Sequence, residues 1–420
     1  MRVLCTAMAS PSHGRALLPL ARALTGAGHE VTVLTTEAVA PVFAADRITV
    51  LPVLPPVPPP PDGTPFDPAQ DMSSPLHPLT ALLIGPYARR ILTILREAAA
   101  RLRPDALVRD GMDFAAVVLA EERGIPHLPL PSGFLNLVEP APLLPALNAL
   151  RAEAGLPDRA DPDSLYPHGR FDFMPSAYSF ARHRGPVLAY RQTTAVEPGG
   201  ALPPWAARLP GDRPLVLAAL GTVLPTFRDA GRDVPLPPEA TDPATTLRTL
   251  VDGLSQLEVT AVVATGGIPL TGATPGPHLH LTDRLPQPLL LECADLFVTH
   301  GGYNSIREAV RTATPMAVVP NFGDQPHNAR RVAALGLGRD LGPDPDAGTL
   351  AAACHGLLAD PALTARLRTA RLAMLTLPEV GRAPADLTDL VSGGRPAAPA
   401  PLPRERRHAP AAVPGRAAVR

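Results

Sequence analysis

The stretch Thr299–Asn328, THGGYNSIREAVRTATPMAVVPNFGDQPHN, decides how this chain is interpreted. It opens with His300 and two glycines, continues into a helix predicted to start at Asn304 and Ser305, and passes through the apolar strand Met316–Val319. A strand end, a glycine turn and a helix amino terminus together form a site for a phosphate. The glycines let the backbone approach, the first N–H groups point outward, and the helix dipole favours an anion. The stretch therefore predicts an α/β architecture with an anion site at a sheet edge.

Two polar residues, Asp324 and Gln325, follow the apolar strand and are expected at the same edge of the sheet. There they are placed to bind a polar group attached to the phosphate. Each piece also has a simpler interpretation. Ser305 followed by Glu308 is an ordinary capping box, and the Asp–Gln pair can simply begin a turn ahead of Pro326. Their occurrence together, in order and at set spacing, favours a sugar on a diphosphate.

In order and spacing, this set resembles the donor-binding signature of nucleotide-sugar-dependent glycosyltransferases of the UDP-glycosyltransferase superfamily. That signature occurs in bacterial antibiotic and macrolide enzymes and in plant secondary-product enzymes. Tyr303 stands where the plant signature usually has Trp. The resemblance extends over the layout of residues 1–390 and implies the GT-B fold, in which the C-terminal half holds the donor.

The periodicity of the chain predicts the same layout. Arg2–Thr6 is an expected strand, Ala16–Ala27 a helix and Glu30–Thr35 a strand, which form a βαβ unit of a parallel sheet. A second βα series begins at the buried strand Leu215–Leu220. Two such series predict an α/β protein with two Rossmann-like α/β/α domains, and the resemblance to the GT-B fold implies that they face each other across an inter-domain cleft. We expect an acceptor-binding domain at 1–196, a linker at 197–213, a donor-binding domain at 214–375, a helix at 376–391 packing back toward the N-terminal domain, and a disordered tail at 392–420.

The resemblance assigns one group of residues to the diphosphate. Thr222 matches a hydroxyl residue that contacts it, and His300, Asn304 and Ser305 match the phosphate contacts of the signature. Gly301 and Gly302 form the turn beside them.

A second group is assigned to the nucleoside and the sugar. Leu285 and Gln287 match the residues that flank the nucleobase and ribose, and Glu308 matches the residue that binds the ribose hydroxyls. Asp324 and Gln325 match the residues that bind the sugar hydroxyls.

The stretch after the first strand resembles the acceptor side of the same family, in which a His in a loop is the catalytic base. That position is His13 here. The chemistry needs such a group because the acceptor hydroxyl is a poor nucleophile, and a neutral imidazole with a pKa near 6.5 suits proton removal at neutral pH. A carboxylate on the far ring nitrogen fixes the tautomer. The resemblance gives this role to Asp110; Asp113 is the rival, but its place favours a helix cap. Ala16 departs from the family, which commonly has Pro there.

Composition excludes several other classes. The chain has 420 residues with a net charge of −1, which gives no electrostatic footprint for nucleic acid or an anionic membrane. Three distant cysteines predict neither a disulfide framework nor a metal site, and no apolar run approaches the roughly 20 residues that span a bilayer. There is no Asp-x-Asp triplet near the signature. We expect a cytoplasmic monomer or homodimer without metal or cofactor.

These observations predict an inverting hexosyltransferase. It moves a hexose from a UDP- or dTDP-sugar to a hydroxyl of a hydrophobic natural product, with His13 as general base supported by Asp110. Two alternatives share the fold: a nucleotide-sugar 2-epimerase, and a catalytically silent partner of another transferase. A dehydrogenase is disfavoured, because no G-x-G-x-x-G follows the first strand.

Overall fold

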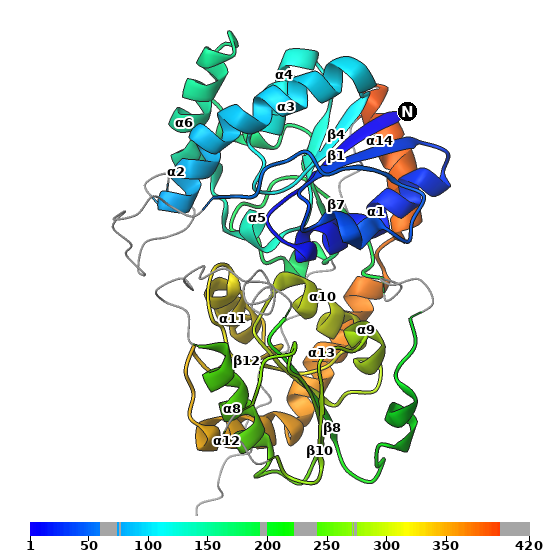
Figure 1. The fold of residues 1–420 in the computed structure, drawn as a ribbon, viewed down its shortest axis with the longest axis vertical. Coiled ribbons are helices and arrows are strands. Elements are labelled where there is room, and N and C mark those ends of the chain that lie inside the picture. The colour runs from blue at the N-terminus through cyan, green and yellow to red at the C-terminus, as the bar shows by residue number, and fades with distance from the viewer. Residues whose placement is uncertain are drawn as a thin grey trace, which may run out of the picture.

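The computed structural model describes residues 1–58, 74, 77–193, 200–221, 242–270, 272 and 275–394. The chain forms two parallel α/β halves, stacked one above the other in Figure 1. Thr222 and nearly all of the expected tail 392–420 lie outside these residues. No helix within the described ranges is long and apolar enough to cross a membrane.

The N-terminal half is built on a five-stranded sheet with the order β3-β2-β1-β4-β5 and parallel pairing throughout. Its strands are β1 (Arg2–Ala7), β2 (Glu30–Thr35), β3 (Thr49–Leu51), β4 (Ala106–Arg109) and β5 (His127–Pro129). Its helices are α1 (Pro11–Gly26), η1 (Ala40–Phe43), α2 (Pro78–Ile84), α3 (Pro86–Leu102), α4 (Ala115–Arg123), α5 (Gly133–Leu137), α6 (Pro140–Glu153) and η2 (Pro162–Leu165).

Both faces of this sheet are covered, as its nearly continuous apolar strands require. Val3 and Cys5 of β1 pack in the cluster that contains the apolar residues of α1, whereas Leu4 packs with those of α3 and α4. The alternation follows from the two-residue period of a strand. Parallel strands with helices on both faces place every β-to-α turn at one edge of the sheet, which is the edge facing the other half in Figure 1.

The C-terminal half repeats the plan with six parallel strands in the order β10-β9-β8-β11-β12-β13. The strands are β8 (Leu215–Ala219), β9 (Thr260–Ala264), β10 (Leu279–Thr282), β11 (Leu296–Thr299), β12 (Met316–Val318) and β13 (Gly338–Asp340). The helices are α8 (Pro243–Leu254), α9 (Gln287–Leu290), α10 (Tyr303–Thr312), α11 (Gln325–Ala334), α12 (Ala347–Leu358) and α13 (Pro361–Leu375).

Two segments join the halves. After α13 the chain returns through η5 (Val380–Arg382) to α14 (Ala383–Val391), whose Leu387 is buried in the N-terminal core beside α1. The second connection is a segment that extends from the N-terminal half toward the C-terminal half. It contains β6 (Arg170–Asp172), η3 (Ser176–Tyr178) and β7 (Val187–Ala189). Its Met174 and Phe180, each 1% exposed, are buried in the C-terminal core. Burial of a side chain of this size stabilises by about 1.5–3 kcal/mol. The linker region then contains η4 (Pro204–Arg208).

One helix begins earlier than the sequence pattern predicts, since α1 starts at Pro11 rather than Ala16. Pro11 occupies the first turn, where its missing N–H costs nothing because that N–H has no intrahelical partner. His13 is therefore in the first turn of a helix and not in a loop, which corrects the expectation for this residue.

Candidate active site

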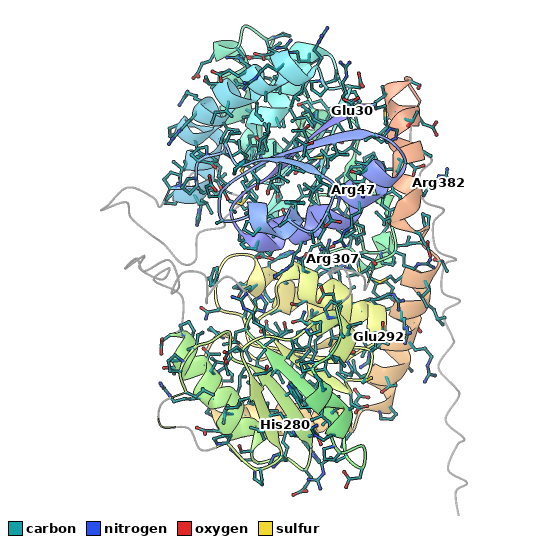
Figure 2. The ribbon with its side chains drawn as sticks, turned by 45° about the vertical axis from the view of Figure 1, so that its right-hand side comes forward. Glu30, Arg47, His280, Glu292, Arg307 and Arg382 are labelled. Atoms are coloured by element: carbon teal, nitrogen blue, oxygen red, sulfur yellow. The ribbon has the colours of Figure 1, made fainter. Side chains whose placement is uncertain are left out.

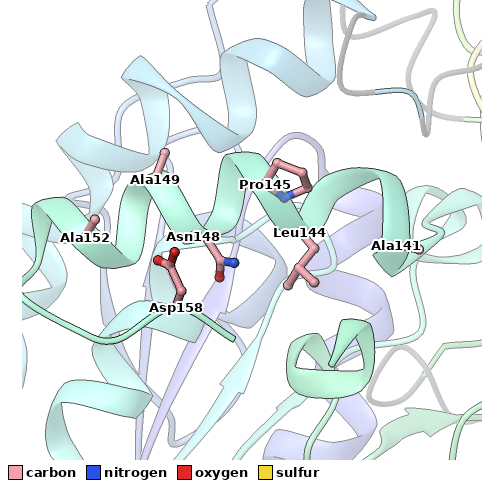
Figure 3. Close-up of a pocket in the computed structure, with 7 residues that line it drawn as sticks. All are labelled: Ala141, Leu144, Pro145, Asn148, Ala149, Ala152 and Asp158. Carbon is pink, nitrogen blue, oxygen red and sulfur yellow. The ribbon is translucent and has the colours of Figure 1, made fainter. Parts of the chain in front are cut away.

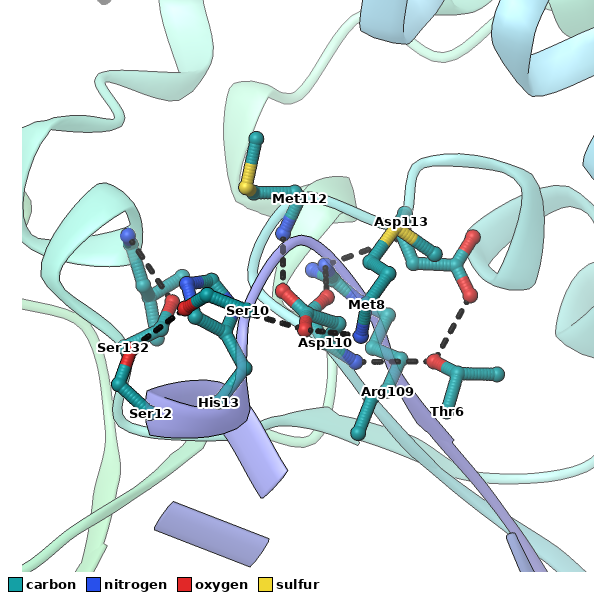
Figure 4. A network of polar contacts seen from close by, with 12 residues as sticks. Thr6, Met8, Ser10, Ser12, His13, Arg109, Asp110, Met112, Asp113 and Ser132 are labelled. Carbon is teal, nitrogen blue, oxygen red and sulfur yellow. Dashed lines mark hydrogen bonds and ion pairs between the residues drawn. The ribbon is translucent and has the colours of Figure 1, made fainter. Parts of the chain in front are cut away.

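His13 and Asp110 are brought together as predicted from their places after two neighbouring strands. β1 pairs with β4 in parallel, so α1 and the turn after β4 begin at the same edge of the sheet. The Nδ1 atom of His13 lies 2.8 Å from Oδ2 of Asp110 (Figure 4). The imidazole therefore shares a hydrogen bond with a carboxylate. This bond favours the tautomer in which Nδ1 carries the proton and Nε2 carries the lone pair.

The carboxylate of Asp110 is fixed by the backbone around it. It is fully buried and accepts hydrogen bonds from the N–H groups of Met8 at 2.9 Å and Met112 at 3.0 Å. Its own N–H donates to the hydroxyl of Thr6 at 2.9 Å. Because every partner belongs to β1, to α1 or to the turns after β1 and β4, the His–Asp pair is formed within one half of the molecule.

Two carboxylates influence the charge of His13. Burial lowers the pKa of this imidazole, but the adjacent Asp110 and the charge of Asp324 from the other half outweigh burial, and the pKa rises above 6.5. The side chain remains 14% exposed, and no hydrogen-bond partner for Nε2 occurs in the described part of the chain. This nitrogen is thus left for an external hydroxyl group.

Asp113, the rival carboxylate, has other partners. It accepts from the hydroxyl of Thr6 at 2.8 Å and from the N–H of Ala116, in the first turn of α4, at 3.0 Å. The N-cap residue of α4 is Phe114, so the expected cap at Asp113 is displaced by one residue. Burial raises the pKa of Asp113 to about 6. Its oxygens serve the fold rather than the imidazole.

On the opposite side, α10 presents an open amino terminus. The N-cap residue is Gly302, and no side chain from the described residues caps the helix. Ser305 is the third residue of α10 rather than its cap, so the capping-box interpretation of Ser305 and Glu308 is wrong. The glycine turn lets the helix begin two residues before Ser305, and the first-turn N–H groups remain available to an anion.

His300 lies behind this turn, packed between two glycines. A Cβ atom would lie 2.5 Å from the imidazole at Gly221 and 2.4 Å from it at Gly302, so both positions exclude a side chain. Gly221 also has a φ of +79°, which favours glycine. Burial lowers the pKa of His300 to about 4, and the ring is therefore neutral near pH 7.

Three of the predicted donor residues contact one another. The Nε2 group of Gln287, the first residue of α9, donates to the hydroxyl of Ser305 at 3.1 Å and to Oε2 of Glu308 at 2.6 Å. Burial raises the pKa of the Glu308 carboxyl, although the hydrogen bond from Gln287 and the charge of Arg307 oppose this rise. A ligand with hydroxyl groups can replace Gln287 as the partner of this carboxylate.

Asp324 and Gln325 lie at the start of α11, not in a separate turn. Gln325 accepts the N–H groups of Asn321 and Phe322 through Oε1, at 2.8 and 3.2 Å. Burial raises the pKa of Asp324 to about 6, although the hydrogen bond from Asn328 and the charge of His13 lower it.

The carboxylate of Asp324 reaches into the N-terminal half. A Cβ atom built on Gly133, the first residue of α5, would lie 1.9 Å from Oδ2 of Asp324. The two halves are linked again where the amide of Asn304 donates to the carbonyl of Ser12 at 2.9 Å. The start of α10 is thus adjacent to the residue before His13.

Not every predicted residue is placed in this group. Leu285 is partly buried and packs against the C-terminal core, and Thr222 is outside the described residues. No group of three His, Cys, Asp or Glu side chains that could hold a metal ion occurs among the described residues. A hollow along α6 is separate from the site, since none of the predicted residues lines it (Figure 3). It is lined by Ala141, Leu144, Pro145, Asn148, Ala149, Ala152 and Asp158.

Some residues at the boundary between the halves carry no signal in the sequence. Gly133 follows Ser132 as an ordinary helix start would, and Ser12 contributes only its carbonyl. Arg307 looks like a surface charge on a helix, yet it is 2% exposed. Only the packing of one half against the other assigns them to this region.

Comparison with known proteins identifies the family. Residues 248–389 match the family model described as Erythromycin biosynthesis protein CIII-like, C-terminal domain. L-demethylnoviosyl transferase of Streptomyces niveus is 30% identical over 380 residues, which cover 86% of this chain and 90% of that protein. Elloramycin glycosyltransferase ElmGT of Streptomyces olivaceus is 31% identical over 403 residues, covering 92% and 96%.

Solved structures show the same fold. The calicheamicin glycosyltransferase CalG4 superposes with a TM-score of 0.70 at 22% identity, covering 93% of this chain and 98% of that one. The spinosyn rhamnosyltransferase SpnG, complexed with thymidine diphosphate, superposes with a TM-score of 0.71 at 21% identity, covering 92% and 100%. The two parallel α/β halves are thus those of the GT-B fold. The chain belongs to the glycosyltransferases of antibiotic biosynthesis.

Proposed function

We propose that the protein is an inverting glycosyltransferase that transfers a hexose from a UDP- or dTDP-sugar to a hydroxyl group of a hydrophobic natural product. His13 is the general base and Asp110 orients it. The observation that carries this proposal is the 2.8 Å contact between His13 Nδ1 and Asp110 Oδ2, with no hydrogen-bond partner for Nε2 among the described residues. The contact between Asn304 and Ser12 supports it, because it brings the donor helix beside the base.

The reaction is a single displacement. The acceptor O–H gives its proton to Nε2 of His13, and the oxygen uses the released electron pair to form a bond to the anomeric carbon. The bond from that carbon to the phosphate oxygen breaks, and its electron pair leaves with the nucleoside diphosphate. Asp110 stabilises the imidazolium that forms. Attack opposite the leaving group converts an α-linked donor into a β-linked product.

The donor diphosphate binds at the amino terminus of α10, where unpaired N–H groups and the helix dipole stabilise the negative charge that develops on departure. Neutral His300 and Thr222 add hydrogen bonds to the phosphates. Gln287 and Glu308 bind the ribose, with Leu285 beside the base. Asp324 and Gln325 bind the sugar hydroxyls. No metal or cofactor takes part in this scheme.

Two similar glycosyltransferases favour thymidine over uridine as the nucleoside of the donor. The SpnG structure contains thymidine diphosphate, and the similar glycosyltransferase VinC was solved with dTDP. The hydroxyl-binding pair Asp324–Gln325 favours a sugar rich in hydroxyl groups, such as glucose.

The test is a transfer assay with UDP-glucose and dTDP-glucose against a panel of phenolic and macrolide acceptors, read by mass spectrometry and by NMR of the anomeric proton. We expect a β-linked product. An α-linked product would exclude direct displacement by the activated hydroxyl. Epimerised donor without an acceptor product would support the 2-epimerase instead.

A further inference from the structure

One segment of the N-terminal half, residues 172–180, contacts both halves of the molecule. Phe173 is buried in the N-terminal core, whereas Met174 and Phe180 are buried in the C-terminal core. We call residues 172–180 the brace. Both donor helices, α10 and α11, form hydrogen bonds to it.

Tyr303, the first residue of α10, is hydrogen-bonded to the brace. Its hydroxyl donates to Oδ1 of Asp172 at 2.7 Å, and both side chains are buried. Asp172 is itself held by Arg170 at 3.3 Å and by the N–H of Phe173 at 2.8 Å. Burial and the charge of Asp172 raise the pKa of Tyr303 well above 10, so the phenol keeps the proton that it donates. The start of the donor helix is therefore fixed to a rigid carboxylate of the other half.

Arg307, one turn further along α10, extends this connection toward the base. Its guanidinium lies over the rings of Tyr303 and Phe173, with 4.9 and 5.1 Å to the centroids. It donates to the carbonyl of Pro131 at 3.3 Å and to the side chain of Asn304, which in turn donates to the carbonyl of Ser12. Figure 2 shows Arg307 where the two halves meet. A continuous series of contacts thus runs from the brace to the residue before His13.

The second donor helix, α11, contacts the same brace. His327 donates through Nε2–H to the carbonyl of Phe180 at 2.7 Å, and Arg331 donates through Nε to the carbonyl of Ser179 at 2.9 Å. The helix that carries Asp324 and the helix that binds the diphosphate are therefore held by one segment.

We propose that Tyr303 and Arg307 are positioning residues, which hold the amino end of α10 in register with His13 through the brace. The proposal rests on the proposed transfer reaction for its kinetic consequence. Neither side chain needs to touch the reacting atoms. A displacement near 1 Å between nucleophile and donor can lower the rate by about 10²-fold, so a hydrogen bond that sets this distance acts on turnover.

The experiment compares two Tyr→Phe variants that each remove one buried hydrogen bond to an aspartate. Tyr303→Phe breaks the bond to Asp172. The control Tyr190→Phe breaks the 2.9 Å bond from the Tyr190 hydroxyl to Asp386 of α14 and leaves the backbone bond from Tyr190 N–H to the carbonyl of Asp172 in place. A purely structural role affects both variants alike. Arg331→Gln removes the hydrogen bond from Arg331 to the carbonyl of Ser179 in the brace. It serves as a second variant should Tyr303→Phe not fold.

For Tyr303→Phe we expect kcat to fall about tenfold, while the Kd of UDP or dTDP measured by calorimetry changes less than about twofold. Tyr190→Phe keeps the wild-type kcat, and Arg331→Gln lowers kcat to a smaller degree. Equal kcat values for Tyr303→Phe and Tyr190→Phe would overturn the proposal. A loss of nucleotide affinity that matches the loss of turnover would also overturn it, because Tyr303 would then act in binding.

A measurement that needs no activity separates this proposal from the transfer reaction. Cys293 is exposed, Cys5 and Cys354 are buried, and Arg47 of the N-terminal half is exposed, so Cys293 and an Arg47→Cys variant accept a pair of spin labels. We expect Tyr303→Phe, but not Tyr190→Phe, to broaden the distance distribution between the labels. If the protein transfers no sugar but the Tyr303→Phe variant shows this broadening, the positioning role of Tyr303 is supported and the proposed transfer reaction is overturned. If the enzyme is active but the distance distribution is unchanged in Tyr303→Phe, the transfer reaction is supported and the positioning role is overturned.

Discussion

The two sides of the cleft differ in how their polar groups are satisfied. On the N-terminal side, Asp110 is bonded to two backbone N–H groups and to His13, and all of these partners come from that half. On the C-terminal side, Gln287 is bonded to Ser305 and Glu308. Asn304 there is bonded to the opposite half. The polar groups of the N-terminal side are thus satisfied within that half. On the C-terminal side, protein groups occupy the hydrogen-bonding positions that a ligand would use.

This difference separates two kinds of effect. A preorganised pair loses nothing when the acceptor arrives, so its removal acts on the chemical step. Donor residues exchange one partner for another, and the net gain of such an exchange is modest. Substitutions of the His13–Asp110 pair should therefore lower turnover, and substitutions of the side chains proposed to bind the nucleotide should weaken its binding.

The largest expected effect is that of His13→Ala. Removal of a general base lowers transfer by about 10²–10⁴-fold, while binding of UDP or dTDP by calorimetry stays near the wild-type value. The matched control is His29→Ala, since His29 lies before β2 and contacts the amino terminus at 3.3 Å instead of Asp110. Unchanged turnover in His13→Ala would remove the base assignment and with it the contrast between the two sides.

Gly133→Ala tests where the two sides meet. The added methyl group would lie 1.9 Å from Asp324 Oδ2, so the carboxylate must move away from the cleft. We expect transfer to fall about 10–100-fold, because a displacement of this size disturbs the geometry of attack. Helix propensity favours Ala at this first position of α5, so thermal stability should not report a local defect. Gly26→Ala is the control, because no atom lies within 4 Å of its added Cβ. Equal activities of the two variants would mean that the position of Asp324 does not matter.

Glu308→Gln tests the donor side. The amide is a poorer acceptor for ribose hydroxyls than the carboxylate, and loss of a charged hydrogen bond corresponds to about tenfold weaker nucleotide binding. Calorimetry with UDP and dTDP measures this, with the exposed Glu292→Gln as control. If kcat falls and nucleotide affinity is retained, Glu308 acts in the chemical step. The proposed difference between the two sides, turnover on one and nucleotide binding on the other, would then be wrong.

The sequence predicts the parts of the site that depend on local order along the chain. His13 and Asp110 each follow a strand of a parallel sheet, and neighbouring parallel strands end at one edge, so their meeting follows from topology. The two α/β halves likewise follow from the two βα series, and the GT-B fold that the resemblance implies is confirmed by the solved structures.

The contacts between the halves could not be predicted in this way. Gly133 and Asp324 are nearly 200 positions apart and belong to different halves, so no periodicity relates them. The start of α10 was misplaced for a local reason. Ser305 and Glu308 have the spacing of a capping box, but the helix starts at Tyr303, directly after the glycine turn. Their side chains therefore do not cap the helix and instead accept hydrogen bonds from Gln287.

The smallest effect concerns pH and tests whether Asp324 acts across the cleft. Burial lowers the pKa of His13, and Asp110 and then Asp324 raise it above 6.5. A general base must be neutral, so kcat/KM for the acceptor should rise with pH through this pKa. Asp324→Asn removes a negative charge that stabilises the imidazolium, so the pKa falls and the rising limb moves to lower pH. NMR titration of His13 and the pH profile of kcat/KM should move together, while Asp283→Asn, whose carboxylate is exposed and accepts from Thr265, leaves both in place. A limb that stays fixed in Asp324→Asn would show that His13 responds to its own half alone, and the contrast between the two sides would then be complete.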